Sequence, residues 1–163
     1  MTVRVVSALS DAARLRPAEP ADVPGITDCV RLAYQHFVAR IGRPPAPMLD
    51  DYSRVLEQRM VMLATVDDEI AGVLVLAETD EGFLLDNVAV DPKFQRRGIG
   101  RALLEHAEQR ARFSGYDCMH LYTNELMVEN RYLYTRLGYR EYDRRVEQGL
   151  FRVYMRKALL VPN

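Results

Sequence analysis

The spacing of apolar residues along the chain predicts four helices. In the first, an apolar side chain recurs every three or four positions between Asp22, a suitable N-cap, and Gly42, a suitable end. The four helices are expected over residues 22–40, 50–59, 98–113 and 128–137.

Seven shorter apolar runs, each bounded by turn-forming residues, predict strands. They span residues 13–16, 60–66, 70–77, 83–90, 117–123, 139–145 and 150–156. The prolines of residues 43–48 fix φ and remove backbone donors, so this segment is expected to be a loop. The order β-α-α-β-β-β-α-β-α-β-β indicates an α/β fold. The helix after the fourth strand allows that strand and the fifth to run parallel.

Composition narrows the class of protein. The chain of 163 residues is 48% hydrophobic and 28% charged, which is typical of one globular domain. Its formal net charge of −1 disfavours a nucleic-acid binder, and no apolar run reaches the roughly 20 residues of a membrane helix. Cys29 and Cys118 are expected to be reduced thiols, and no cluster of cysteine and histidine predicts a metal site. We therefore expect a cytoplasmic protein that binds neither nucleic acid nor membrane.

The strongest chemical signal lies where the fourth predicted strand turns into the third predicted helix. The first amides of a helix are unpaired and lie at its positive dipole end. Gly98 and Gly100 allow a ligand to approach the backbone closely. Positive charge comes from three arginines, Arg96, Arg97 and Arg101. Such a helix start is suited to bind a pyrophosphate.

Two familiar phosphate-binding loops do not match this stretch. A Walker A loop requires Gly-Lys-Ser/Thr, which is absent, and a dinucleotide loop requires a third glycine where the chain has Leu103. The pattern that does match is Gln/Arg-x-x-Gly-x-Gly/Ala after a Val-Ala-Val-Asp-Pro strand end, present as Gln95-Arg96-Arg97-Gly98-Ile99-Gly100. An ordinary helix start with a solvated arginine cluster is the alternative interpretation.

With this motif the chain resembles the GNAT superfamily of acetyltransferases. The resemblance continues through Leu121-Tyr122-Thr123-Asn124 and the Tyr-x-x-x-Gly-Tyr stretch that begins at Tyr134, and it covers residues 13–157. It implies a single GNAT domain over residues 1–163, with residues 1–12 as an N-terminal extension. It also implies a mixed, mostly antiparallel central sheet of six to seven strands with flanking helices, in which strands 4 and 5 are parallel and splayed.

The resemblance implies that acetyl-CoA is the cosubstrate. Main-chain amides from Arg96 to Arg101 would hold its pyrophosphate. The pantetheine arm would lie along residues 88–90, where one amide could polarise the thioester carbonyl. Many relatives carry an asparagine at the position of Met127, so Asn124 and Asn130 are alternative contacts in this chain. The expected coenzyme-binding residues are Val88, Ala89, Val90, Gln95, Arg96, Arg97, Gly98, Ile99, Gly100, Arg101, Asn124 and Asn130.

The implied reaction is direct attack of a primary amine on acetyl-CoA in a ternary complex. An alkyl amine with a pKa of about 10.4 is mostly charged at neutral pH, so a base or a water relay must remove a proton. Tyr134 is the expected acid for the leaving thiolate; a tyrosine that only packs or binds the sulfur is the alternative. Asp86 is the expected base, with Glu81, Glu125 and ordered water as alternatives. Because Asp86 alternates with Asn87 along its strand, only one of them is expected to face the acceptor.

The acceptor site is expected where the first two helices meet the last hairpin. Asp86 and Tyr52 are the expected acceptor-binding residues, with Tyr52 stacking on the amine, and Asp50, Asp51 and Glu147 could attract a cation. Asp50 as a helix cap is an equally weighted alternative.

The acceptor is expected to be a small-molecule amine rather than a protein, and the protein is expected to be a homodimer. A noncatalytic acyl-CoA-binding or sensing module is the alternative function. Such a module would bind the coenzyme without turnover and would be insensitive to Tyr134→Phe.

Overall fold

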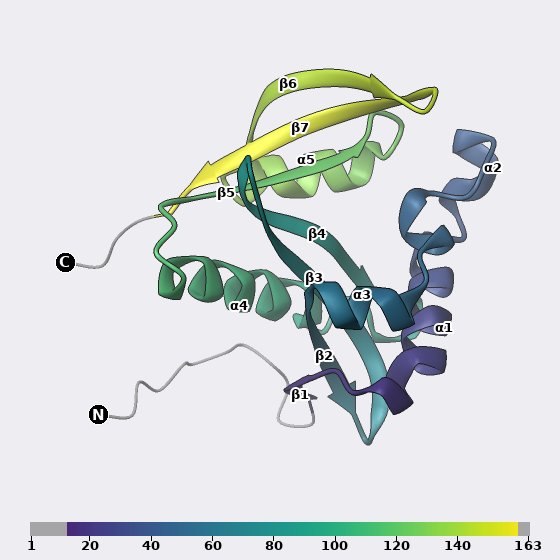
Figure 1. Ribbon diagram of the computed structural model, residues 1–163. Helices are drawn as coiled ribbons and strands as arrows, with labels where there is room; N and C mark the ends of the chain where they lie inside the picture. Colours follow the sequence, from purple (N-terminus) through teal and green to yellow (C-terminus); the bar gives the residue numbers. More distant parts are fainter. Residues whose placement is uncertain (1–12, 160–163) are drawn as a thin grey trace.

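A seven-stranded mixed sheet forms the centre of the computed structural model, which describes residues 13–159 (Figure 1). The expected N-terminal extension, residues 1–12, lies outside the described residues. The strand order across the sheet is β1-β2-β3-β4-β5-β7-β6. The strands are β1 (Ala13–Pro17), β2 (Met60–Val66), β3 (Glu69–Thr79), β4 (Gly82–Val90), β5 (Cys118–Asn124), β6 (Arg140–Glu147) and β7 (Leu150–Ala158).

The only parallel pair within residues 13–159 is β4 with β5, which confirms the mixed sheet expected from the sequence. This pairing is short: Phe83, Leu84 and Leu85 of β4 lie opposite residues 119–121 of β5. Beyond these three pairs the two strands no longer pair with each other. Each stays bound to its outer neighbour, β4 to β3 and β5 to β7, so the sheet splits along its middle.

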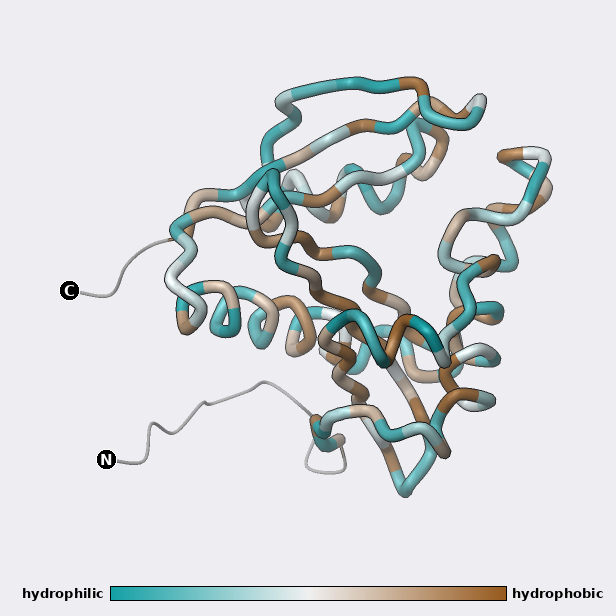
Figure 2. Tube along the Cα trace, viewed as in Figure 1, coloured by the Kyte–Doolittle hydropathy of each residue, from teal (hydrophilic) through white to brown (hydrophobic). Residues whose placement is uncertain are grey.

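The helices cover both faces of the sheet. They are α1 (Val23–Tyr34), α2 (Phe37–Ile41), α3 (Tyr52–Gln58), α4 (Ile99–Phe113) and α5 (Val128–Arg136). Because side chains alternate along β3, Leu74 and Leu76 lie in the core that α4 covers, whereas Val73 and Val75 lie in the core beneath α1 and α3. Figure 2 shows the hydrophobic segments concentrated along the central strands.

Gly72 in β3 brings α4 close to the sheet. A Cβ added at Gly72 would lie 2.9 Å from Leu103 Cδ1 and 3.0 Å from Ile99 Cγ2. A larger residue would push the helix outward. The glycine therefore fixes the first turn of α4 beside the end of β4.

Three local predictions were wrong. The first predicted helix does not run without a break to Arg40: α1 ends at Tyr34, and the chain becomes helical again in α2. Arg40, near the end of α2, contacts Glu129 of α5. The expected loop 43–48 contains part of a 3₁₀ helix, Ala46–Leu49. The N-cap of α3 is Asp51, whose side chain accepts a hydrogen bond from Ser53 N at 3.0 Å, and not the preceding aspartate. A tertiary contact of Arg40 accompanies the break in the first helix, and the side chain of Asp51 caps the start of α3.

No helix within residues 13–159 has both the length and the apolar character needed to cross a membrane.

Candidate active site

The split between β4 and β5 exposes main-chain groups of β4. The amide of Asp91 donates to the carbonyl oxygen of Ala71 at 2.9 Å, so the main chain at this position faces β3. Alternate residues of a strand direct their N–H and C=O groups to the same side. Ala89 therefore also faces β3, whereas the main-chain groups of Val88 and Val90 face the side from which β5 has diverged.

A β-bulge in β4 changes the direction of two polar side chains. Asn87 lies opposite Val75 and Leu85 lies opposite Leu76, so Asp86 is an extra residue without a partner in β3. Asp86 and Asn87 consequently line the same cavity. The expectation that only one of them would face it was wrong, because strict alternation ends at the bulge.

The loop between β4 and α4 presents a row of unpaired amides. Arg96 has φ +65° and Gly98 has φ +78°, and left-handed residues of this kind turn successive N–H groups toward one point. The first amide of α4 with a main-chain acceptor is that of Ala102, which donates to the carbonyl of Gly98. Within the described part of the chain, no hydrogen bond is made by the amides of residues 96–101.

These amides border a groove of about 490 Å³ between β4, α4 and α5, which we call the β4–α4 groove. Most residues predicted to bind the coenzyme line it: Val88, Ala89, Val90, Gln95, Arg96, Gly98, Ile99, Gly100, Arg101 and Asn130. Arg97 does not line it; its guanidinium lies over the ring of Phe94, 5.4 Å from the centroid.

A second cavity of about 280 Å³ opens where β4 and β5 diverge, and we call it the β4–β5 cavity. It reaches from the 3₁₀ segment before α3 to the β6–β7 turn. Both spaces share four lining residues, Tyr34, Val88, Asn130 and Tyr134. A ligand in the groove and a ligand in the cavity can therefore meet at these residues.

Tyr134 on α5 lies at this junction with its hydroxyl free. The residue is 8% exposed, and its ring packs edge-on against Tyr139 with centroids 5.7 Å apart. Its hydroxyl makes no hydrogen bond to any residue between 13 and 159. Burial raises the pKa of Tyr134 to about 12, so the hydroxyl keeps its proton at neutral pH.

Asp86 lies in the β4–β5 cavity between two polar neighbours. Its carboxylate forms an ion pair with Arg59, and the hydroxyl of Tyr122 approaches it at 3.5 Å. Burial raises the pKa of Asp86, while the charge of Arg59 opposes this shift.

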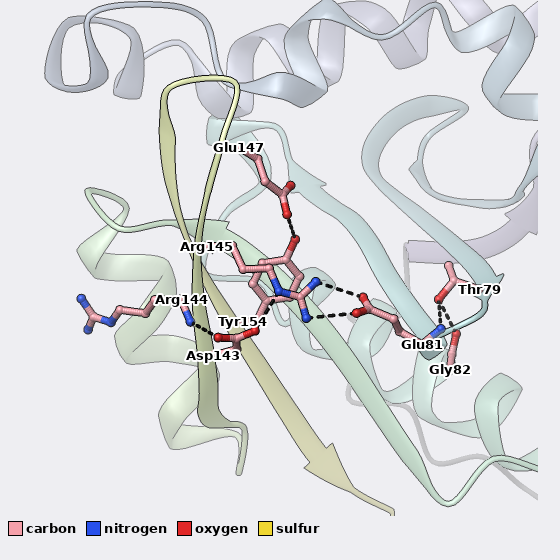
Figure 3. Close-up of polar contacts among 8 residues, drawn as sticks. All are labelled: Thr79, Glu81, Gly82, Asp143, Arg144, Arg145, Glu147 and Tyr154. Carbon is pink, nitrogen blue, oxygen red and sulfur yellow. Dashed lines mark hydrogen bonds and ion pairs between the residues drawn. The ribbon is translucent and has the colours of Figure 1, made fainter.

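The alternative bases lie elsewhere. Glu81 in the β3–β4 turn contacts Arg145 of β6 at 3.0 Å (Figure 3), and Glu125 contacts Arg144 at the same distance. Neither glutamate lines the β4–β5 cavity or the β4–α4 groove. Among the three acids that the sequence suggested as bases, only Asp86 lines the β4–β5 cavity, which opens onto the junction.

The two asparagines predicted as coenzyme contacts occupy different places. Asn130 on α5 borders both spaces. Asn124 lines only the β4–β5 cavity, and its side-chain oxygen accepts a hydrogen bond from Leu126 N at 2.8 Å. Asn124 therefore shapes the turn between β5 and α5 and lies away from the groove.

The prediction that Tyr52 stacks on the acceptor was wrong. Tyr52 is 2% exposed and does not line the cavity. Its hydroxyl donates to the carbonyl oxygen of Pro47 at 2.6 Å and accepts a hydrogen bond from Asn87 at 3.3 Å. Tyr52 instead positions the proline segment that forms one wall of the cavity.

Of the other acids expected near the acceptor, only Asp50 lines the cavity. Asp51 caps α3. Glu147 accepts a hydrogen bond from Tyr154 at 2.6 Å (Figure 3) and pairs with Arg152.

Sequence reasoning missed Tyr34. Its hydroxyl donates to Asn87 Oδ1 at 2.6 Å and lies 3.2 Å from the carbonyl oxygen of Val88, so α1 is tied to β4 at the junction. The residue sits on the apolar face of its helix, and its pattern is that of a core residue. No cluster of three or more His, Cys, Asp or Glu suited to a metal ion occurs within residues 13–159.

Comparison with known proteins places the chain among acetyltransferases. The family model described as acetyltransferase (GNAT) domain matches residues 57–141, just over half of the chain. The [ribosomal protein bS18]-alanine N-acetyltransferase of Salmonella typhimurium is 34% identical over 85 residues, which are 52% of this chain and 57% of that protein. The uncharacterized N-acetyltransferase YvbK of Bacillus subtilis is 31% identical over 101 residues, 61% of this chain and 63% of that protein. The chain thus matches less than two thirds of either relative.

A solved structure shares the fold over nearly the whole chain. The PaiA N-acetyltransferase of Thermoplasma acidophilum, in complex with coenzyme A, superposes with a TM-score of 0.74 at 17% identity, covering 90% of this chain and 98% of that one. At this identity the likeness establishes the fold.

Proposed function

Because the chain belongs to the GNAT acetyltransferase family, we propose that it transfers an acetyl group from acetyl-CoA to a primary amine of a small molecule. One observation carries the proposal. The β4–α4 groove and the β4–β5 cavity meet at Val88, Asn130 and Tyr134, so a thioester from one side and an amine from the other can come together there.

The residues of the groove fit acetyl-CoA. Six consecutive amides, those of residues 96–101, have no hydrogen-bond acceptor within residues 13–159. They lie at the positive end of α4 and suit a pyrophosphate. The outward amides of Val88 and Val90 offer donors to a pantetheine arm. Their carbonyl oxygens, which Tyr34 and Gln95 approach at 3.2 and 3.4 Å, each keep a second lone pair as an acceptor. These groups would bind the coenzyme through the backbone, so small apolar side chains suffice in this stretch of β4.

In the proposed reaction, the amine nitrogen forms a bond to the acetyl carbon and the carbon–sulfur bond breaks. The amide of Val88 or Val90 would stabilise the negative charge on the carbonyl oxygen, and one such donor contributes about 3 kcal/mol. Tyr134 would give its proton to the leaving thiolate. The proton lost by the amine would pass to Asp86 directly or through water.

Asp86 has properties that suit a base. Its raised pKa makes it more basic than an ordinary aspartate. The ion pair with Arg59 keeps it ionised, and the bulge directs it into the cavity. Tyr34 and Asn87 contribute by holding β4 in position at the junction.

The walls of the cavity favour a small acceptor. Arg43 reaches across to the β6–β7 turn and donates to the carbonyl oxygen of Gln148 at 2.6 Å. Arg40 pairs with Glu129 of α5 at 2.6 Å. The Arg43 contact lies at the turn that borders the cavity, whereas Glu129 lines the β4–α4 groove. Both contacts tie the α2 segment to the C-terminal half, which would leave less room for a folded protein substrate. The Salmonella relative is named for an alanine of a ribosomal protein, so a peptide beginning with alanine is the appropriate competitor in an assay.

The first test is thermal unfolding with acetyl-CoA, CoA, ATP and NAD added separately. A ligand at 100 times its dissociation constant stabilises the folded state by about 2.7 kcal/mol, which raises Tm by several degrees. We expect a shift with acetyl-CoA and CoA only. No shift with either at millimolar concentration would refute the coenzyme site.

The second test is release of CoA thiol in the presence of small primary amines and of a peptide beginning with alanine. Faster release with a small amine supports the proposal. Coenzyme binding without turnover of any amine would instead identify a noncatalytic acyl-CoA-binding module. Faster release with the peptide than with every small amine would assign the acceptor to proteins.

A cytoplasmic homodimer remains part of this proposal. Cys29 and Cys118 are both free, in keeping with a reducing compartment. Light scattering of the purified protein would give the oligomeric state directly.

A further inference from the structure

Asp86 lies at a position where the sheet itself does not fix the direction of its side chain. It is the extra residue of the bulge in β4, so no residue of β3 lies opposite it. The parallel pairing with β5 also ends one residue earlier, at Leu85 opposite Leu121. Contacts from outside β4 must therefore decide which way the carboxylate points.

Two side chains from other elements each approach a different oxygen of this carboxylate. The guanidinium of Arg59 forms an ion pair with Oδ2, and the hydroxyl of Tyr122 lies 3.5 Å from Oδ1. Within residues 13–159, no other group donates a hydrogen bond to either oxygen. The guanidinium thus occupies Oδ2. The hydroxyl lies at the limit of hydrogen-bond length from Oδ1, which keeps room for a further donor.

Both neighbours are held by rigid parts of the fold. Arg59 is the C-cap of α3 and the residue before β2, and its amide donates to the carbonyl oxygen of Val55 at 2.9 Å. Tyr122 lies opposite Tyr154 of β7, and its ring is covered by the guanidinium of Arg152, 4.6 Å from the centroid. A carboxylate held from two such points keeps one orientation, which a group that transfers protons requires.

Arg59 is the dominant charge acting on Asp86. The titratable or charged groups near this carboxylate come from α1, the α3 segment, β5 and β7, and they are Tyr34, Asp50, Tyr52, Arg59, Tyr122 and Arg152. Burial raises the pKa of Asp86, whereas Arg59 and then the hydroxyl of Tyr122 oppose this shift. Burial also raises the pKa of each of the three tyrosines, so they stay neutral, and Arg152 is paired with Glu147.

We infer that Arg59 and Tyr122 are positioning residues, which fix the carboxylate of Asp86 so that Oδ1 takes the proton from the amine. This inference rests on the proposed function. The proton that the amine loses forms a bond to Oδ1, which has a second lone pair beside the hydroxyl of Tyr122. Tyr122 keeps its own proton and Arg59 keeps its charge throughout. Both residues therefore act only through Asp86.

The first measurement is kcat/KM against pH, with the small primary amine that releases CoA fastest. Asp86 must be ionised to accept a proton, so kcat/KM should fall as pH drops through its pKa. Tyr122→Phe and Arg59→Met remove groups that favour the ionised carboxylate, so each should move this acid limb to higher pH. We expect a move of about 0.5 to 1 pH unit for Tyr122→Phe and of about 1 unit or more for Arg59→Met. Arg59→Lys retains the charge and should keep most of the parent profile.

Two control variants remove the same chemical groups outside the cavity. Arg54→Met takes an arginine from α3 whose side chain is 79% exposed, and Tyr142→Phe takes a hydroxyl from β6. Neither residue lines the β4–β5 cavity, so both variants should leave the acid limb unchanged. Because Arg59 and Tyr122 do not line the β4–α4 groove, the Kd of CoA should be the same in all variants.

Carbon-13 NMR of the Asp86 carboxyl in the coenzyme-free protein gives a readout that needs no turnover. The signal is identified by its absence from Asp86→Asn. Its titration midpoint should rise in Tyr122→Phe and in Arg59→Met, and it should stay constant in the two controls. A variant that only loosened the fold would lower Tm without this selective rise.

The outcomes distinguish this inference from the function on which it rests. A carboxyl titration that is unchanged in Tyr122→Phe and in Arg59→Met would overturn the inference, whatever the rates. A midpoint that rises while the acid limb stays in place would assign the proton to another group and refute it as well, with amine acetylation intact. CoA binding without CoA release from any small amine or from the peptide beginning with alanine would overturn the proposed function and, with it, the role of Oδ1.

Discussion

At the scale of single residues, Tyr134 combines burial with a hydroxyl that makes no hydrogen bond within residues 13–159. Buried tyrosines usually donate a hydrogen bond, so an unpaired hydroxyl at the meeting point of two cavities is available to a ligand. Its pKa of about 12 ensures that the proton is present over the whole neutral range. The residue is therefore better suited to give a proton to a thiolate than to accept one.

Replacement of Tyr134 by phenylalanine should reduce turnover by about 10²- to 10⁴-fold, because a general acid contributes this much to a rate. Affinity for CoA should change little, since the ring and its packing on Tyr139 remain. Tyr132→Phe is the control: this tyrosine lies on the same helix and is 65% exposed. Turnover of Tyr134→Phe equal to that of the control would exclude the tyrosine as proton donor.

Residue patterns alone could identify Tyr134 but not its neighbours. The tyrosine lies in a spaced motif, whereas Tyr34 has the helical spacing of a core residue and reaches the site only because α1 crosses β4. For Tyr52 the sequence led to the opposite mistake, because it predicted an acceptor-binding residue. The hydroxyl of Tyr52 instead donates to the carbonyl oxygen of Pro47 and accepts a hydrogen bond from Asn87. Direction of a side chain depends on packing between distant segments, which local spacing does not encode.

At the scale of elements, the loop from β4 into α4 depends on backbone conformation. Gly98 precedes the helix with φ +78°, a value that costs other residues about 1–2 kcal/mol. The sequence predicted this loop well, because glycine positions and a helix start are local features. The bulge at Asp86 was not predicted, because it arises from pairing with β3.

Gly98→Glu should abolish coenzyme binding, because it introduces a carboxylate among the amides that we propose to bind the pyrophosphate. Gly115→Glu is the matched control. Gly115 follows the same helix with φ +87°, and a Cβ added there meets no atom within 4 Å. Both variants carry similar backbone strain, so thermal unfolding should show similar losses of Tm. Only Gly98→Glu should lose the Tm increase with CoA; a retained increase would contradict the assignment of the loop.

At the scale of the whole molecule, the part of the sheet up to β4 joins the part from β5 onward through a short strand pairing. The β4–β5 pairing holds three residue pairs, and Arg40 and Arg43 add contacts between segments 89 and 105 residues apart. Element order and the crossover helix were sufficient to predict the parallel pair, whereas the mixed, mostly antiparallel sheet was implied by the resemblance to the GNAT family. The contacts of Arg40 and Arg43 join residues too distant in sequence for any local pattern to indicate them.

Charge in the cavity should reduce the stability of the molecule at neutral pH. Because the pKa of Asp50 is raised in the folded state, the folded protein binds more protons than the unfolded chain, and stability falls as pH rises through the raised pKa. Asp50→Asn should therefore unfold at higher urea concentration than the parent at pH 7. The difference should disappear below the unfolded pKa of about 3.9.

In the same experiment, Asp22→Asn should change the free energy of unfolding in the opposite direction. Its hydrogen bond with Arg16, 2.7 Å long, lowers the pKa of Asp22, so the carboxylate stabilises the fold above the unfolded pKa and loses this effect as pH falls through the lowered value. This variant should be less stable than the parent at pH 7, and the gap should narrow in acid. If both variants shift in the same direction, the linkage argument fails.

The divergence of β4 from β5 leaves two interior strand edges with no peptide partner among residues 13–159. In most sheets such edges occur only at the rim, where charge or proline protects them against aggregation. In the proposed complex the coenzyme arm would take the place of the missing strand, so the sheet would be complete only in the bound form. We therefore expect the yield and shelf life of the purified protein to follow the supply of CoA, with ligand-starved preparations the first to precipitate.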